Sequence, residues 1–218
     1  MIFDIRSHPK TASRVRQAAR ELSQADPVLA RLIRQVGPCH LPMTRRNHYF
    51  FALVEAILYQ QLGMKAAAVI VARFRALYPA RRFPTAADIL NTPVSRLRAA
   101  GLSSQKISYL KELSRRVQDG SFPLRSVSAM DDGQVIQHLT QIRGIGRWTA
   151  EMFLIFSLGR PDVLPRSDLG IRKAVQTAYR LTRLPSEDTL EQLGEKWKPY
   201  RSIAAWYLWA SADGNETG

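Results

Sequence analysis

Apolar residues recur at intervals of three and four along most of this chain, which is the spacing of a buried helix face. Residues 46–62 and 65–78 each carry such a face. The first face comprises Phe50, Val54, Ile57 and Leu58, and the second comprises Ala66, Val69, Ile70, Phe74 and Leu77. An alternation of period two extends over a few residues at most, with one short strand allowed near Ile2–Ile5. The pattern therefore predicts an all-α fold.

Capping residues and prolines divide the pattern into separate helices, because both mark the start of a helix. The predicted helices are Lys10–Ala25, one beginning at Asp26-Pro27, 46–62, 65–78, Pro93 to Gly101, one capped by Ser103 or Ser104, Asp131 to about Ile142, 147–158, one opened by Ser167 or Asp168, one beginning at Ser186, and Pro199 to about Ala212. Residues 213–218 fit a frayed tail.

The chain shows no fixed-period repeat and no low-complexity linker, so residues 1–218 are predicted to form a single functional unit. Within it we expect two helical subdomains. The central helices, about 46–146, form one, and residues 1–45 together with 147–218 form the other. Ligand sites favour junctions between such parts, so we expect a binding cleft between the two subdomains.

The charge adds a class of partner to this picture. The net charge is +14, and 25 of the 32 basic residues are arginine. Arginine suits bidentate contact with phosphate, so the composition favours binding to nucleic acid. A GC-rich genome also inflates arginine content, and the charge alone does not decide between the two explanations.

Several classes of protein are excluded by what the composition lacks. Cys39 is the single cysteine, which excludes an intrachain disulfide, a cysteine zinc site and a four-cysteine iron–sulfur cluster. The four histidines show no metal-ligand spacing. No apolar run reaches the length of a membrane span, and the N-terminus lacks the apolar region of a signal peptide. We therefore expect a cytoplasmic, nucleoid-associated protein with no membrane partner.

The first candidate site is the turn Gly144-Ile-Gly146 between two helical patterns. A Gly-x-Gly turn lets backbone N–H groups approach a phosphate, and the helix N-terminus that follows favours an anion. Arg143 and Arg147 bracket the turn and add positive charge. Such contacts position a nucleic acid and read no bases. The alternative is a tight connection between two helices that needs glycine for steric reasons alone.

A single acid, Asp168, follows Gly146 by 22 residues. Aspartate is a preferred residue at a helix start, so Asp168 is predicted to cap a helix. The same position supports chemistry, because a carboxylate at a helix N-terminus is favoured in its ionised form. A fixed anion in a desolvated site can stabilise a developing cation or orient a water molecule. Both roles are compatible with the sequence.

Aromatic residues gather near the C-terminus, where Trp197, Trp206 and Trp209 account for three of the four tryptophans. Stacked indoles can hold a flat base, and their faces attract a cationic one. We expect two of these three tryptophans to be structural and at most one to face a ligand. Arg201, in the same stretch, fits either an ion pair with a buried acid or a contact with phosphate.

The stretch Gln60-Gln-Leu62-Gly-Met-Lys65 lies between two helices with apolar faces. A bulky apolar tip beside a lysine suits insertion into a stack of bases. An ordinary helix end, with Gly63 in the left-handed conformation, is the simpler interpretation of the same residues.

Together these residues resemble the helix–hairpin–helix DNA glycosylase superfamily and, within it, the 3-methyladenine DNA glycosylase II branch. The similarity covers residues 45–210. It is carried by Gln60-Gln-Leu62 with Lys65-Ala-Ala, Leu97-x-x-x-Gly101-Leu-Ser with Lys106 and Leu110, Gly144-Ile-Gly146-Arg-Trp148-Thr-Ala, Pro165-x-x-Asp168-Leu, and Trp197-x-Pro-Tyr-Arg201-Ser. The spacing from hairpin to Asp168, together with the terminal Trp and Arg residues, makes the match specific.

The resemblance assigns a role to each of these motifs. It implies that Asp168 is the catalytic carboxylate and that Leu62 is the wedge that fills the gap left by a flipped nucleotide. The residues implied to contact the DNA backbone are Lys65, Gly144, Gly146 and Arg147. Those implied to line the base pocket are Trp148, Met152, Leu169 and Trp209. It also implies a structural monovalent cation on the backbone carbonyls of Thr140, Ile142 and Gly144, and no cofactor for catalysis.

Three departures from the family pattern bear on these expectations. The chain is too short for the additional N-terminal β domain of the best-known bacterial relatives. Met152 and Leu169 are aromatic in some relatives, so a wider, less stacked pocket is expected here, and the resemblance leaves the substrate range open. The hairpin begins with Ile142-Arg143 where apolar-Pro is more usual.

The expected activity is excision of alkylated purines from double-stranded DNA by a monomer. Relatives that also cleave the strand carry a nucleophilic lysine where this chain has Trp148, so a monofunctional enzyme without a Schiff base is expected. Three alternatives remain: a duplex-binding protein without catalysis, a glycosylase of the same fold that acts on mismatched thymine, uracil or oxidised purines, and a basic helical adaptor.

Overall fold

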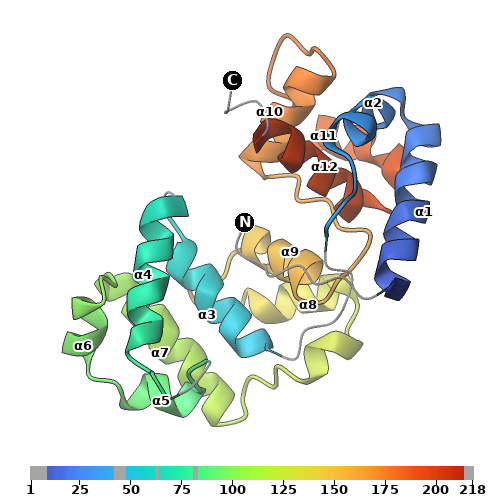
Figure 1. Ribbon diagram of the computed structural model, residues 1–218. Coiled ribbons are helices and arrows are strands. Elements are labelled where there is room, and N and C mark those ends of the chain that lie inside the picture. The colour runs from blue at the N-terminus through green and yellow to red at the C-terminus, as the bar shows by residue number, and fades with distance from the viewer. Residues whose placement is uncertain (1–8, 42–47, 62–63, 81–82, 214–218) are drawn as a thin grey trace. The chain divides into compact units, whose positions relative to one another are not determined.

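The computed structural model describes residues 9–41, 48–61, 64–80 and 83–213, and over these ranges the chain is helical with no strand. In chain order the helices are α1 (Pro9–Ala25), α2 (Pro27–Val36), α3 (Tyr49–Tyr59), α4 (Met64–Ala76), α5 (Ala86–Asn91), α6 (Val94–Ala99), α7 (Ser104–Gln118), the 3-10 turn η1 (Ser126–Ala129), α8 (Asp132–Leu139), α9 (Arg147–Phe156), α10 (Leu169–Ala178), α11 (Glu187–Gly194), the 3-10 turn η2 (Glu195–Trp197) and α12 (Arg201–Asp213) (Figure 1). The all-α prediction is confirmed. The strand allowed near Ile2–Ile5 and the tail at 214–218 lie outside the described residues.

The chain divides into two compact units. Unit 1 comprises Met1–Arg45 and Leu154–Gly218, and unit 2 comprises Arg46–Phe153. The second boundary lies inside α9, seven residues after the boundary that the sequence suggested at residue 146. The hairpin therefore belongs to unit 2, and Asp168 belongs to unit 1.

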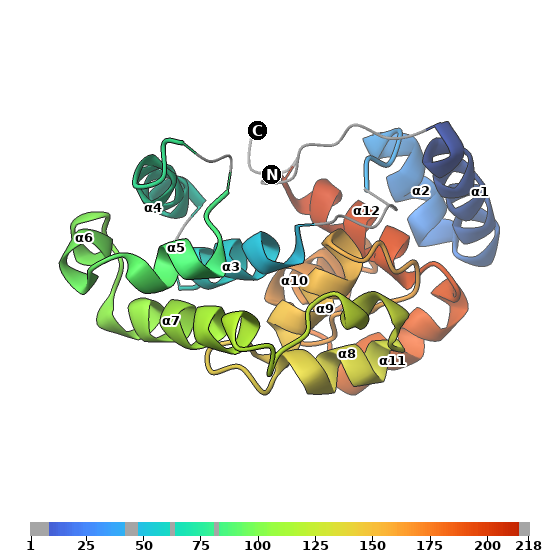
Figure 2. The ribbon, with the colours of Figure 1, turned by 90° about the horizontal axis from the view of Figure 1, so that it is seen from below.

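Unit 2 is built around α3 and α7, which run side by side in both Figure 1 and Figure 2, with α4 against α3 and with α5 and α6 against α7. Its core differs in detail from the predicted faces. On α3 the buried residues include Phe51 and Leu53, whereas Phe50 is half-buried. The reason is that α3 has neighbours on more than one side, so almost its whole surface is apolar and its spacing does not single out one face.

The buried face of α4 shares Phe74 with the predicted one and is displaced by one position over the first half of the helix. Ala67, Val71 and Phe74 are buried, while Ala66 and Val69 are exposed. Both sets follow the i, i+3, i+4 spacing, and only the contact with α3 decides which of them is covered.

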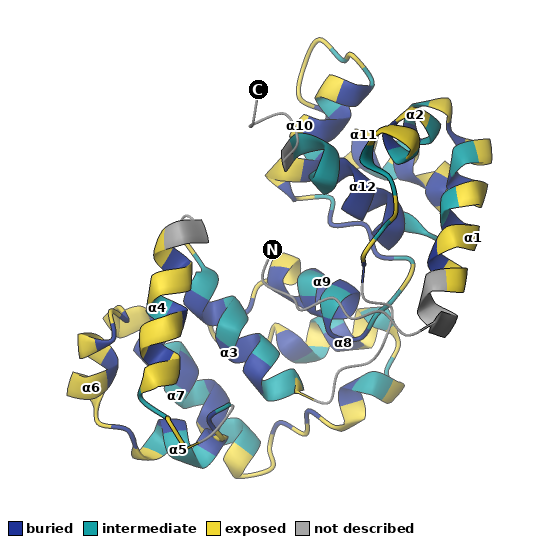
Figure 3. Ribbon diagram, in the orientation of Figure 1, coloured by how far each residue is buried: buried dark blue, intermediate teal, exposed yellow. Residues whose placement is uncertain are grey.

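Unit 1 is centred on α12, which packs against α1, α2 and α10. Consecutive residues of α12 from Ser202 to Leu208 are buried, in contrast to α1, where Figure 3 shows an exposed outer side. On α1 the buried residues Val15, Ala18 and Leu22 follow a single helical face. The last helix is thus the core of its unit, and it begins at Arg201, two residues after the proline predicted to open it.

Side-chain caps set several helix starts, as the sequence predicted for Ser103, Asp131, Asp168 and Ser186. One helix, α5, was not predicted, because its six residues are too few to show a period. A capping box between Thr85 and Asp88 starts it, and this pair of residues is the sequence feature that could have predicted the helix. Helix α8 ends at Leu139 instead of near Ile142, because a tight turn toward the hairpin follows it.

Candidate functional site

The hairpin of unit 2 links α8 to α9 through residues 140–146, and its first glycine is required by sterics. Gly144 has a φ of +87°, which disfavours any side chain. A Cβ at this position would lie 2.1 Å from the ring of Tyr109, which reaches the turn from α7. The ring thus packs directly on the hairpin backbone. Tyr109 was not singled out from the sequence, since 35 residues separate it from Gly144.

At the second glycine of the hairpin, Gly146, no contact with the described residues requires the absence of a side chain. A Cβ on Gly146 would meet none of the described atoms within 4 Å, and its φ lies outside the left-handed range. Gly146 precedes α9 and accepts a hydrogen bond from the N–H of Ala150 at 3.0 Å. Because it carries no side chain that could cap α9, an anion can approach the first turn of that helix closely. The absence of a side chain at Gly146 is better explained by the close approach of a ligand than by packing within the protein.

The end of α3 holds the hairpin by a direct hydrogen bond. The Gln60 side chain donates from Nε2 to the Gly144 carbonyl oxygen at 2.5 Å. Gln60, Lys106, Tyr109, Arg143 and Gly144 are among the residues that line a cavity of about 420 Å³ at this point. Lys106 donates to the Leu58 carbonyl at 2.6 Å, and burial lowers its pKa. The predicted wedge, Leu62, follows Gln60 by two residues and lies outside the described residues.

The predicted cation ligands are all in this turn. The Gly144 carbonyl accepts from Gln60, and the Ile142 carbonyl accepts from the N–H of Ile145 at 3.0 Å. The structure places Thr140 directly after α8. A cation on these carbonyls stays a prediction. In the part of the chain that the structure describes, no group of three or more His, Cys, Asp or Glu side chains could hold a metal ion.

Arg147 opens α9 beside the hairpin and remains largely in solvent. Its Nε lies 2.9 Å from Oε1 of Glu151, one turn further along the helix, and its side chain is 62% exposed. Glu151 is buried, so the pair holds the guanidinium at the surface next to Gly146. The side chain of Lys65, the other predicted backbone contact, lies outside the described residues.

Asp168 of unit 1 caps α10 and is 9% exposed. Its Oδ1 accepts a hydrogen bond from the N–H of Ile171 at 2.8 Å and another from the indole Nε1 of Trp209 at 3.1 Å. A Cβ on Gly170 would come within 3.1 Å of the same oxygen, so glycine leaves room for it. The capping role that the sequence predicted is therefore present, and it fixes the carboxylate in one orientation. Neither Gly170 nor the Trp209 contact was predicted.

The predicted base-pocket residues divide between the two units. In unit 2, Trp148 is 45% exposed and Met152 is half-buried. In unit 1, Leu169 is 52% exposed beside Asp168, and Trp209 is half-buried and stacks on Phe156 at 5.8 Å between ring centroids. The other two C-terminal tryptophans, Trp197 and Trp206, are buried, as expected for structural residues.

Arg201, for which the sequence left two partners open, pairs with an acid. Its Nε lies 2.8 Å from Oδ1 of Asp162 and its Nη2 lies 3.0 Å from Oδ2, which is a bidentate ion pair. The Arg201 side chain is only 16% exposed. Its role is to fasten the start of α12 to the loop before α10, and contact with phosphate is not its function.

No described helix has the length and hydropathy that a membrane crossing requires.

Comparison with known proteins adds three kinds of similarity. Residues 54–199 match the model of the family described as HhH-GPD superfamily base excision DNA repair protein. The chain is 35% identical to DNA-3-methyladenine glycosylase 1 of Schizosaccharomyces pombe over 215 residues, 97% of this chain and 94% of that protein.

Solved structures agree with the sequence matches. The 3-methyladenine DNA glycosylase of Schizosaccharomyces pombe in complex with abasic DNA aligns with a TM-score of 0.83 and 36% identity, over 90% of this chain and 97% of that one. A DNA-3-methyladenine glycosidase from Bacillus halodurans aligns with a TM-score of 0.78 and 30% identity, over 100% of this chain and 95% of that one.

Proposed function

The chain belongs to the HhH-GPD superfamily of base excision DNA repair proteins, and from this premise we propose that it is a monofunctional DNA N-glycosylase for alkylated purines such as 3-methyladenine. The observation that carries the proposal is Asp168, an acid held in one orientation at a helix N-terminus by Ile171 and Trp209. The names of relatives that match nearly the full length of the chain support the substrate class.

The proposed reaction breaks the bond between the sugar C1′ and the purine nitrogen. Alkylation at a ring nitrogen makes the base cationic, so it leaves with the bonding electron pair as a neutral molecule. The sugar is left with oxocarbenium character, which the Asp168 carboxylate stabilises electrostatically. A water oxygen then bonds to C1′, and its proton passes through Asp168 to solvent.

The base must leave the duplex before this step. Extrusion costs a few kcal/mol, and less for a poorly stacked damaged base, which gives part of the selectivity. In the proposal Leu62 fills the vacated position, and Trp148, Met152, Leu169 and Trp209 receive the base. The side chains of Trp148 and Leu169 are exposed within their own units.

The hairpin supplies the grip on the DNA backbone in this proposal. Gly146 leaves open space at the start of α9, and Arg147 stands beside it. Backbone N–H groups at a helix start bind a phosphate without reading sequence. We also infer that the enzyme acts as a monomer, that the hairpin carbonyls bind a monovalent cation, and that no strand cleavage accompanies excision, since Trp148 stands where bifunctional relatives carry lysine.

The deciding experiment compares Asp168→Asn with the unaltered protein in an assay of free 3-methyladenine released from alkylated DNA. Asparagine is as good a helix cap as aspartate, so α10 keeps its start while the negative charge is lost. We expect almost no base release and retained binding to an abasic-site analogue. Asp131→Asn is the matched control, because Asp131 is also a helix-capping aspartate, and it should leave release unchanged.

Two results would contradict the proposal in different ways. Release near the unaltered rate by Asp168→Asn would remove Asp168 from the chemistry. No release of any base by the unaltered protein, with salt-sensitive DNA binding retained, would favour a duplex-binding protein without catalysis.

A further inference from the structure

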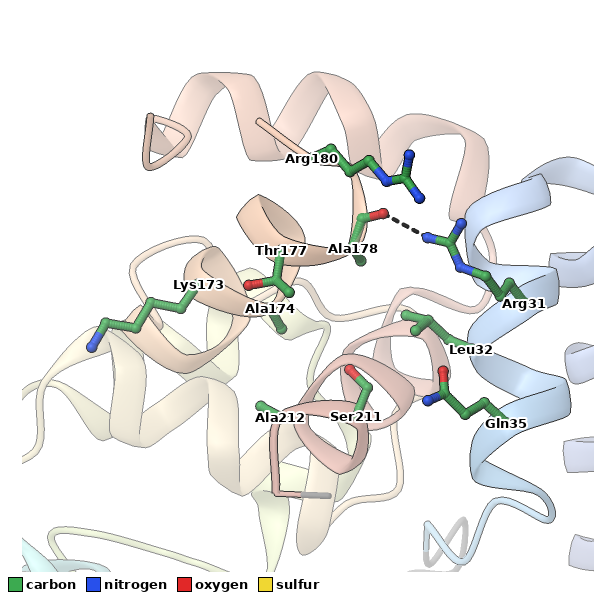
Figure 4. Close-up of a pocket in the computed structure, with 10 residues that line it drawn as sticks. All are labelled: Arg31, Leu32, Gln35, Lys173, Ala174, Thr177, Ala178, Arg180, Ser211 and Ala212. Atoms are coloured by element: carbon green, nitrogen blue, oxygen red, sulfur yellow. Dashed lines mark hydrogen bonds between the residues drawn. The ribbon is translucent and has the colours of Figure 1, made fainter. Parts of the chain in front are cut away.

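A basic cavity lies in unit 1 on residues to which no role has been given. Its volume is about 390 Å³. Helix α2, the second half of α10 and the end of α12 form it, as Figure 4 shows. Its floor is apolar, made by Leu32, Ala174 and Ala178, which are buried. Three cationic side chains, Arg31, Lys173 and Arg180, stand around that floor, and none of the ten described residues that line it is acidic.

Arg31 is held in place at one end of the cavity. Its Nη2 donates to the carbonyl oxygen of Ala178 at 2.7 Å. The bond satisfies a carbonyl that the end of α10 leaves without a helical partner. It uses one of the five N–H donors of the guanidinium, so the group is oriented while most of its donors remain for a ligand.

Arg180 occupies a backbone position that ordinarily belongs to glycine. Its φ is +54°, in the left-handed range. The N–H of Leu181 donates to the carbonyl of Gln176 at 2.9 Å, and the N–H of Arg180 donates to the carbonyl of Thr177 at 3.3 Å. These two bonds are the Schellman ending of a helix, in which glycine is preferred at the position of Arg180. The arginine side chain is therefore kept at a conformational cost, which points to a use for it.

The two arginines point into the same end of the cavity. In Figure 4 the Arg180 side chain extends toward that of Arg31, whereas Lys173 reaches out at the opposite end. Like charges brought together repel one another, and among the described residues neither arginine takes part in any of the ion pairs that the structure shows. A bound anion would relieve this repulsion and would be met by two planar groups suited to bidentate contact.

We propose that this cavity is a phosphate-binding site in which Arg31 and Arg180 hold the oxyanion and Lys173 adds charge. The phosphate is either a phosphodiester of the DNA backbone or a free phosphate compound, since both present the same oxygens. In the first case the proposal rests on the proposed function, because it adds a backbone contact in unit 1 to the one at the hairpin of unit 2.

The test uses Arg180→Asn in the full-length protein. Asparagine tolerates a left-handed backbone and carries no charge, so the helix ending survives and the thermal midpoint should not fall. Arg180→Lys keeps the charge and Arg183→Gln is the matched control, because Arg183 is an exposed arginine three residues away that does not line the cavity. Each protein is measured for affinity to undamaged duplex DNA from 50 to 300 mM salt, and for thermal stabilisation by inorganic pyrophosphate.

If the ligand is the DNA backbone, Arg180→Asn should weaken binding about tenfold at low salt and reduce the salt slope by about one unit, while Arg183→Gln stays near the unaltered values. Arg180→Lys should keep the salt slope, because it keeps the charge, and should bind with an affinity between those of Arg180→Asn and the unaltered protein, because it loses the bidentate contact. If the ligand is a free phosphate, pyrophosphate should stabilise the unaltered protein and not Arg180→Asn, with DNA affinity unchanged. Unchanged DNA binding together with no pyrophosphate effect would overturn the proposal.

These measurements need no excision of a base. An enzyme that fails to release 3-methyladenine but loses DNA affinity on Arg180→Asn would contradict the proposed function and support the phosphate site. Normal excision of 3-methyladenine, with no effect of Arg180→Asn on DNA affinity and no stabilisation by pyrophosphate, would support the proposed function and contradict the phosphate site.

Discussion

At the scale of single residues, two hydrogen bonds hold the Asp168 carboxylate: the N–H of Ile171 makes it a helix cap, and the Trp209 indole adds a second donor that the proposed reaction would use. Both the Ile171 N–H and the Trp209 indole donate to Oδ1, so the carboxylate cannot rotate freely. Preorganised charge stabilises a developing cation without the cost of reorganisation during the reaction. Structural capping and the proposed catalysis are therefore compatible at this position, as the sequence suggested.

Trp209→Phe tests the contribution of the indole donor. Phenylalanine retains an aromatic ring beside Phe156 but removes the N–H that reaches Asp168. Loss of a hydrogen bond to a charged group is worth about 1.5 kcal/mol or more, so we expect kcat for base release to fall about tenfold. Because the Ile171 bond remains, α10 keeps its cap, and the thermal midpoint should fall by only about 3–6 °C. Single-turnover release at saturating enzyme is the measurement.

Trp206→Phe is the control for that variant, because Trp206 is a buried tryptophan on the same helix. It should lower the thermal midpoint and leave the single-turnover rate unchanged. A rate for Trp209→Phe equal to that of the unaltered protein would show that the indole does not act through Asp168.

The sequence could predict Asp168 but not its surroundings. Its spacing from the hairpin and its capping position are local signals. The Trp209 contact spans 41 residues and the Asp162 partner of Arg201 spans 39. Contacts between residues so far apart in the sequence depend on how the helices pack against one another. Neither helix propensity nor the spacing of apolar residues determines that packing. The two interpretations of Arg201 could be separated only once the packing of α12 was known.

At the scale of elements, the two hairpin glycines have different reasons to be glycine. Gly144 is confined by its own φ and by the Tyr109 ring, whereas Gly146 faces open space. The motif Gly-x-Gly thus combines a folding requirement with a surface suited to close approach by a ligand. The sequence left this choice open for the pair as a whole; the structure gives the steric reason at Gly144 and none at Gly146.

The pair of variants Gly144→Ala and Gly146→Ala should separate these requirements. Gly144→Ala forces a clash with Tyr109 in a left-handed backbone, so we expect destabilisation of about 2–4 kcal/mol. Gly146→Ala should cost less than about 1 kcal/mol, because nothing surrounds the new methyl group. It should nevertheless weaken DNA binding severalfold by blocking the approach to α9. Urea denaturation and DNA titration measure the two effects.

Each variant serves as the control for the other. If Gly146→Ala bound DNA as tightly as the unaltered protein, the hairpin would be a connection between helices and the grip would lie elsewhere. Equal destabilisation by both variants would mean that Gly146 also has a folding role.

Among the elements themselves, the sequence predicted the six-residue α6 but not the equally short α5. The periodic pattern and the caps located α7, α10 and α11. The six-residue α5 offered only its capping box. The predicted face of α4 was right at Phe74 and wrong by one residue over the first half of the helix, because two apolar faces satisfy the same spacing.

At the scale of the whole molecule, unit 1 is tied together by one buried acid. Asp26 is fully buried and caps α2 through the N–H of Val28 at 2.9 Å. Its Oδ2 accepts from the Tyr179 hydroxyl, from the Trp197 indole at 2.9 Å and from Lys196 at 3.1 Å. The sequence predicted Asp26 only as a helix start. Its distant partners, 153 and 171 residues away for Tyr179 and Trp197, make it a junction between the two ends of the chain.

This junction predicts how stability depends on pH. Burial acts to raise the pKa of Asp26, but the hydrogen bonds from Tyr179, Trp197, Lys196 and Val28 outweigh it and hold the pKa below the usual 3.8. The folded state thus favours the carboxylate, and this stabilisation is complete above about pH 4 and is lost as the pH falls through the lower, folded-state pKa.

Asp26→Asn replaces the charge with an amide whose NH2 faces donors, so at pH 7 we expect the free energy of unfolding to fall by about 2–3 kcal/mol. Urea denaturation between pH 3 and pH 7 should show the unfolding free energies of Asp26→Asn and the unaltered protein converging toward low pH. Asp131→Asn, at an exposed cap, is the control, and its unfolding free energy should stay within about 0.5 kcal/mol of that of the unaltered protein at pH 7. A constant gap between Asp26→Asn and the unaltered protein down to pH 3 would show that the ionised form of Asp26 is not what holds unit 1 together.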